Sequence, residues 1–134
     1  MPAHPAAVVR LVGVYDADGG LRGELAYVVG HLLGRVECAL CDITHSPVRR
    51  KRSWDALIAS LPVPMVTVHR NELPPDIAWA VSRDRLPAVY AVRTDGSVAE
   101  LVGRDELRGL DGSVDSFGAL VRDRLVDESA KPTA

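Results

Sequence analysis

The sequence has no long apolar run, no excess of one charge and only two cysteines, and each of these absences excludes a class of protein. No run approaches the ~20 apolar residues that a membrane-spanning helix requires. Sixteen basic and eighteen acidic residues give a formal charge of −2, so we predict neither a nucleic-acid nor a membrane partner. The 134 residues are enough for one domain whose hydrophobic core needs no disulfide bonds.

The composition and the N-terminal residues predict a cytoplasmic protein. Residues 1–5 contain no basic stretch that leads into an apolar one, so we do not expect a signal peptide. In the cytoplasm thiols stay reduced, and two closely spaced cysteines are more typical of catalysis or metal binding than of a structural disulfide.

The two cysteines, Cys38 and Cys41, stand three residues apart, and His45 follows four residues later. This spacing allows a short reversible disulfide, or presents two thiolates to one metal ion. His69, at the end of a predicted strand, supplies a second imidazole. Two thiolates and two imidazoles suit tetrahedral zinc or another transition metal, so the residues leave both chemistries open.

Hydrophobic periodicity predicts strands that alternate with helices. Strands are expected at residues 8–15, 63–69, 88–92 and 98–102, with a short one at 36–43. Helices are expected at residues 21–33, from 53 to 61, at 74–81 and from 114 onward. Residues 94–97 form a predicted hairpin turn, and residues 128–134 a frayed tail. We therefore expect a single α/β domain over residues 1–127.

From residue 63 to the closing helix, with residues 8–15 as the first strand, the order of elements resembles the thioredoxin-like superfamily. The resemblance implies a central mixed sheet of about four strands flanked by helices. In that family a proline before the third strand is cis and packs against the redox cysteines. The resemblance assigns this role to Pro87 and implies a cis Leu86–Pro87 bond.

The position of the cysteines departs from that family. Its members carry Cys-x-x-Cys directly after the first strand, where a helix N-terminus favours a thiolate. Here residues 16–20 hold that position without sulfur, and Cys38 and Cys41 lie in a segment inserted after the first predicted helix. The stretch from Cys38 to Thr44 is also similar to a motif of bacterial proteins of unassigned function, which adds no mechanism.

Connectivity nevertheless predicts where the inserted segment lies. The first two strands are expected to be parallel, so Tyr15 and His69 end at the same edge of the sheet, where ligands of open α/β sheets bind. The helices before and after residues 35–52 must each run from this carboxyl edge toward the opposite edge. Residues 35–52 between them therefore have to lead the chain back to the carboxyl edge. Cys41 and His45 are therefore expected near Asp16, Asp18, His69 and Pro87.

Two chemical hypotheses follow. In the first, Cys38 and Cys41 cycle between dithiol and disulfide beside Pro87, and the partner is a thiol/disulfide protein or a small thiol. His45 or the basic cluster at residues 49–52 would favour the thiolate. In the second, the chain binds a metal through Cys38, Cys41, His45 and His69.

A third hypothesis is of a different class. The chain would be a non-catalytic interaction protein that holds a partner through Trp54, Trp79 or the basic residues 49–52. The sequence does not establish whether the protein is an enzyme, and it names no substrate.

Overall fold

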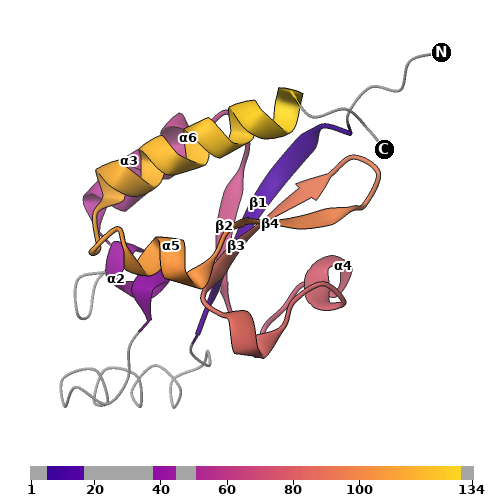
Figure 1. Ribbon diagram of the computed structural model, residues 1–134, viewed down its shortest axis with the longest axis horizontal. Helices are drawn as coiled ribbons and strands as arrows, with labels where there is room; N and C mark the ends of the chain where they lie inside the picture. The colour runs from indigo at the N-terminus through magenta and orange to yellow at the C-terminus, as the bar shows by residue number, and fades with distance from the viewer. Residues whose placement is uncertain (1–5, 17–37, 45–50, 131–134) are drawn as a thin grey trace.

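The computed structural model describes residues 6–16, 38–44 and 51–130. These residues form an α/β arrangement in which a four-stranded mixed sheet lies between helices (Figure 1), so the predicted α/β class is confirmed. The predicted helix at residues 21–33 lies outside the described residues. None of the described helices is long and apolar enough to cross a membrane.

The sheet contains all four of the longer predicted strands. They are β1 (Val8–Tyr15), β2 (Met65–His69), β3 (Ala88–Arg93) and β4 (Val98–Val102), in the order β2-β1-β3-β4. β1 pairs parallel with β2 and antiparallel with β3, and β3 pairs antiparallel with β4. β1 is therefore central, and residues 11–15 are buried, as its continuous apolar run predicts.

The described helices cover the two faces of the sheet unequally. They are α2 (Ala39–Thr44), α3 (Arg52–Ser60), α4 (Pro75–Ala78), α5 (Arg104–Arg108) and α6 (Val114–Ala130). In Figure 1, α2, α3, α5 and α6 lie on one face of the sheet, and the short α4 lies on the other. A 3-10 turn at Arg83–Arg85 connects α4 to β3.

Two local predictions were wrong, and one helix was not predicted. Residues 39–44 form helix α2 and not a strand, because a short run of apolar residues does not distinguish the two. Helix α5 was not predicted. The predicted tail begins too early, because α6 continues through Glu128 to Ala130, and Glu128 forms an ion pair with Arg93 of β3.

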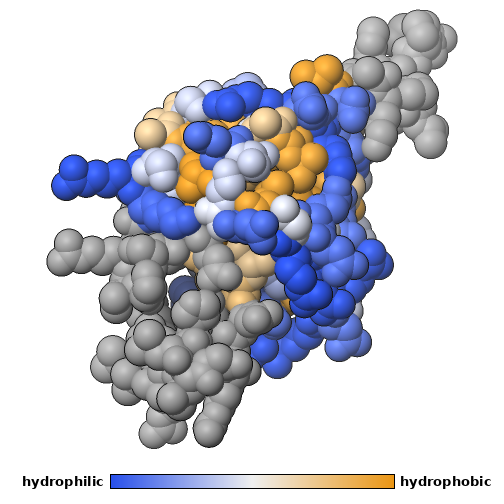
Figure 2. All heavy atoms as spheres, turned by 60° about the vertical axis from the view of Figure 1, so that its left-hand side comes forward, coloured by the Kyte–Doolittle hydropathy of each residue, from blue (hydrophilic) through white to orange (hydrophobic). Residues whose placement is uncertain are grey.

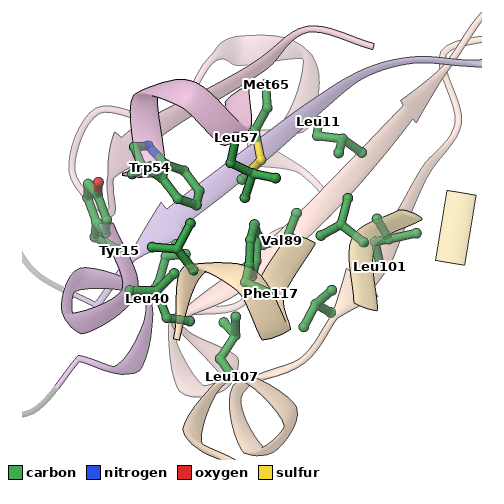
Figure 3. Close-up of a cluster of buried hydrophobic side chains, with 14 of the residues drawn as sticks. Leu11, Tyr15, Leu40, Trp54, Leu57, Met65, Val89, Leu101, Leu107 and Phe117 are labelled. Atoms are coloured by element: carbon green, nitrogen blue, oxygen red, sulfur yellow. The ribbon is translucent and has the colours of Figure 1, made fainter. Parts of the chain in front are cut away.

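The larger hydrophobic core lies between the sheet and the four helices on the first face (Figure 3). Phe117 of α6 is fully buried and its ring centroid lies 5.2 Å from that of Trp54 in α3. Gly118 lets these helices approach closely, since a Cβ there would lie 2.7 Å from a methyl group of Leu57. Figure 2 shows hydrophobic side chains also gathered at the surface on this side, where Ile58 is only partly buried.

A smaller core covers the opposite face of the sheet. Ile77 of α4 and Leu86 pack there against side chains of β1 and β3, among them Val14 and Tyr90. The two cores share the same strands, and alternate residues of β1 point into one or the other. The central strands β1 and β3 therefore contribute to both cores.

Glu106 and Arg124 join α5, α6 and the end of β4. Glu106 accepts a hydrogen bond from the backbone N–H of Gly103 at 3.2 Å and forms an ion pair with Arg124. Arg124 also donates to the carbonyl of Leu101 at 2.8 Å. The hydrogen bond from Arg124 lowers the pKa of Glu106 below its ordinary value of 4.5.

We expect Glu106→Gln to destabilise the protein by about 0.2–1 kcal/mol at neutral pH, because the pair is substantially exposed. A carboxyl group with a lowered pKa in the folded state contributes stability above its unfolded pKa, and this stability disappears as the pH falls through the folded pKa. The difference in melting temperature between the wild type and this variant should therefore shrink on acidification. Asp105→Asn, at a strongly exposed neighbour, is the control and should change the stability by less than about 0.5 kcal/mol.

Candidate functional site

The carboxyl ends of β1 and β2 lie side by side, as predicted. Tyr15 and His69 are partners in the parallel register, and their ring centroids are 5.2 Å apart. His69 Nδ1 lies 2.9 Å from Glu72 Oε1. The Leu86–Pro87 bond is cis, which confirms that prediction, and the following residue pairs with Val14 of β1. Tyr15, His69 and Pro87 thus mark one edge of the sheet.

Helix α2 is held at this edge by buried hydroxyl groups. The hydroxyl of Tyr15 donates a hydrogen bond to Thr44 Oγ1 at 3.0 Å. The hydroxyl of Thr44, which is fully buried, donates in turn to the carbonyl of Cys41 at 3.3 Å. Of the inserted segment, residues 38–44 therefore lie at the carboxyl edge of the sheet, as the connectivity predicts.

A glycine makes room for α2 on the sheet. A Cβ on Gly13 of β1 would lie 3.1 Å from Cδ2 of Leu40, and also close to side-chain atoms of Met65 and Thr67. Because Gly13 has no side chain, Leu40 enters the larger core from α2, as Figure 3 shows. Leu40 stands between the two cysteines in sequence, so its packing fixes the turn that carries both.

The two cysteines lie together across the first turn of α2. Cys38 precedes the helix, and its Sγ accepts a hydrogen bond from the backbone N–H of Cys41 at 3.3 Å. A side-chain hydrogen bond also joins the two thiols, and the backbone of Asp16 hydrogen-bonds to Cys38. Both cysteines are buried, and no disulfide joins them. The pair is a dithiol with its sulfur atoms held close to one another.

The surroundings of Cys38 favour its thiolate overall. Burial raises the pKa of Cys38, but the hydrogen bonds from the Cys41 thiol and from the backbone of Asp16 and Cys41 lower it below its ordinary value. The carboxylate of Asp16 opposes this effect, and it is paired with Arg70 at 3.1 Å. Cys38 is therefore the better candidate for the attacking thiol.

Tyr15 stays protonated beside this pair. Burial raises the pKa of Tyr15, and the nearby Cys41 and Cys38 raise it further, against the hydrogen bonds with Thr44 and Thr67, which lower it. A protonated phenol is a hydrogen-bond donor at neutral pH. Tyr15 therefore anchors α2 and does not act as a base.

The predicted metal ligands are brought together only in part. Cys38 and Cys41 are adjacent, and His69 lies at the same edge beside Tyr15. Within residues 6–16, 38–44 and 51–130, no three histidine, cysteine or acidic side chains form a group that could hold a metal ion. His45 and Asp18 lie outside the described residues. The metal site, and a direct approach of either sulfur to His69 or Pro87, stay predictions.

The residues of the interaction hypothesis fall in different environments. Trp54 is 2% exposed and packs in the core, so its predicted use as a partner contact was wrong. Trp79 is 69% exposed, and its indole N–H donates to the carbonyl of Asp76. Of the basic cluster, Lys51 donates to the carbonyl of Gly112 at 2.8 Å, and residues 49–50 lie outside the described residues.

Sequence reasoning missed Thr44 and Arg70. Thr44 follows Cys41 by three residues, a spacing that in a helix allows a hydroxyl to reach the carbonyl of the preceding turn. Because a strand was predicted for this segment, this helical spacing was not recognised. Arg70 directly follows β2, but only the parallel pairing of β1 and β2 brings it to Asp16.

Comparison of the chain with family models, curated proteins and solved structures finds no match. The described residues form an α/β arrangement with a buried cysteine pair at the carboxyl edge of its sheet. We therefore infer the function of this site from its own geometry and chemistry.

Thr44→Val should lower the free energy of unfolding by about 1–3 kcal/mol, because the buried hydroxyl of Tyr15 and the Cys41 carbonyl each lose a hydrogen bond. Thr67 also hydrogen-bonds to Tyr15, which favours the lower half of that range. Urea unfolding measures the loss. Thr44→Ser, which keeps the hydroxyl, is the control and should be closer to the wild type. Equal stability of the valine variant and the wild type would contradict this role.

Proposed function

We propose that this chain is a thioredoxin-like domain whose Cys38 and Cys41 cycle between dithiol and disulfide. The hydrogen bond from the Cys41 backbone to Cys38 Sγ carries the proposal, because it holds both sulfurs on one turn of chain. The parallel pairing of β1 with β2, and the antiparallel pairing of β3 and β4, support the fold assignment. We also propose a cytoplasmic location, where two closely spaced cysteines are more typical of catalysis or metal binding than of a structural disulfide.

The lowered pKa of Cys38 supports its role as the attacking thiol. Cys41 then resolves the oxidised Cys38 by forming the disulfide. Oxidation removes two electrons and two protons from the pair. Two molecules of a small thiol, or one protein dithiol, return them by thiol–disulfide exchange and are themselves oxidised to a disulfide.

Thiol titration and mass spectrometry test the proposal. The reduced protein should show two titratable thiols after denaturation and, after mild oxidation, none. Its mass should fall by two hydrogen atoms, and peptide mapping should locate the bond between Cys38 and Cys41. A reductant should restore both thiols. Two thiols that resist every mild oxidant would exclude the redox function.

Single-cysteine variants supply the controls. Cys38→Ser and Cys41→Ser should each be unable to form the intramolecular disulfide, while their circular dichroism stays that of the wild type. Elemental analysis of protein purified without chelator separates the redox function from metal binding. A stoichiometric transition metal that protects both thiols from oxidation would favour the metal hypothesis.

A further inference from the structure

The thiol whose surroundings favour reaction is also the less accessible one. Cys38 is 1% exposed and Cys41 is 9% exposed. Donors already surround the Cys38 sulfur, from the Cys41 thiol and from the backbone of Asp16 and Cys41. An oxidant must therefore reach a nucleophilic sulfur in a residue that has almost no exposed surface.

The size of an oxidant decides whether it can reach the buried Cys38 sulfur. In thiol–disulfide exchange, the attacked sulfur must reach contact with the thiolate and remain bound to it as a mixed disulfide, with the rest of its molecule attached. A mixed disulfide of that size does not fit beside Cys38, because this residue is only 1% exposed. A hydroperoxide presents only two linked oxygen atoms at the reacting end.

The charge around Cys38 also favours a hydroperoxide as the oxidant. Among the residues that the structure describes, the groups that face Cys38 include the Cys41 thiol, the Tyr15 phenol and the Asp16 carboxylate, which is paired with Arg70. The Asp16 carboxylate disfavours negative charge at this position. A hydroperoxide is uncharged at neutral pH and brings no further negative charge beside the Asp16 carboxylate, whereas glutathione disulfide carries several carboxylates.

We propose that the oxidant of Cys38 is a small hydroperoxide, an inference that rests on the proposed dithiol/disulfide function and names its substrate class. The Cys38 thiolate attacks the nearer oxygen, the O–O bond breaks, and the distal oxygen leaves with a proton as water or an alcohol. Cys38 becomes a sulfenic acid. The Cys41 thiol then attacks the Cys38 sulfur, forming the disulfide and releasing water. The peroxide is reduced by two electrons and the cysteine pair is oxidised by two.

Competing rates test this inference. The reduced protein is treated separately with hydrogen peroxide and with glutathione disulfide, and loss of thiols is followed in the folded protein and in urea. The rate in urea serves as the reference in which access is not limited. We expect the folded-to-unfolded rate ratio to be at least about ten times larger for the peroxide than for the disulfide, because folding restricts access far more for the larger reagent.

Trapping with a sulfenic-acid probe identifies the attacked sulfur. In Cys41→Ser, Cys38 should form a sulfenic acid at a rate close to that of thiol loss in the wild type. In the matched Cys38→Ser variant, Cys41 should react at least about ten times more slowly, since the hydrogen bonds that favour a thiolate converge on Cys38. Circular dichroism of both variants establishes that they are folded.

The possible failures are distinct. If glutathione disulfide oxidises the folded protein at least as readily as peroxide on this scale, the hydroperoxide inference is overturned while the dithiol/disulfide function stands. If Cys38 forms a sulfenic acid but the wild type closes no disulfide, peroxide is supported as the oxidant and the proposed cycle fails. If neither reagent oxidises the folded protein, both are overturned.

Discussion

Replacing Phe117 by alanine is expected to lower the free energy of unfolding by about 3–5 kcal/mol, the largest loss that we predict for a single side chain. Phe117 has no exposed surface, and its ring packs on Trp54 at the centre of the larger core. The cost combines the lost burial of the ring with the cavity that remains between α6 and α3. Urea unfolding, followed through the tryptophan fluorescence, measures it.

Two control variants accompany Phe117→Ala. Phe117→Leu keeps most of the apolar volume and should retain much of the stability that the alanine variant loses. Val126→Ala, on the exposed side of the same helix, should change the stability by less than about 0.5 kcal/mol. A cost for Phe117→Ala as small as that of Val126→Ala would show that the α3–α6 contact is not as described.

Leu40→Ala should cost about 2–5 kcal/mol and should also expose the thiols. Leu40 is fully buried and joins α2 to the sheet between the two cysteines. Without this contact α2 separates from the sheet more often, so a bulky alkylating reagent should modify Cys38 faster than in the wild type. Urea unfolding measures the first effect, and the labelling rate under native conditions measures the second.

Ile77→Ala is the matched control for Leu40→Ala. Ile77 is equally buried but lies in the smaller core on the opposite face of the sheet. We expect a comparable loss of stability with much less effect on thiol labelling. If both variants accelerate labelling equally, then the thiols are reached by global unfolding and Leu40 has no local role.

A second substitution tests the contact between Leu40 and Gly13 directly. Gly13→Ala should destabilise the wild type by about 1 kcal/mol or more, because its methyl group crowds Leu40. In the Leu40→Ala background that crowding is removed, so the same change should cost less. Additive costs would mean that the two residues do not interact.

The sheet was predictable from the sequence because its strands carry a strong local signal. The apolar runs of β1 and β3 mark buried strands, and the Asp95–Gly96 turn places β4 directly after β3. Gly96 has φ +83°, the conformation that such a turn requires of it. Helix α5 has only five residues, too few for a periodic pattern to appear.

The site was predictable in location but not in detail. Connectivity required the cysteine segment to return to the carboxyl edge, and the contact between Tyr15 and Thr44 agrees with that. The assignment of Cys38 as the attacking thiol depends on the backbone of Asp16, which is distant in sequence. A sequence pattern carries no information about such a hydrogen bond, nor about how far folding buries a sulfur atom.

Because Cys41 lies in a six-residue helix and Cys38 directly precedes it, both buried, their labelling by a bulky reagent reports the local opening of that helix. Such an opening breaks the contacts of α2 with the sheet and leaves the rest of the domain folded, so its free energy should lie below that of global unfolding. Cys38 is then a built-in probe of conformational fluctuation at the carboxyl edge. Labelling rates measured over a range of urea concentrations would give the surface area exposed in that opening.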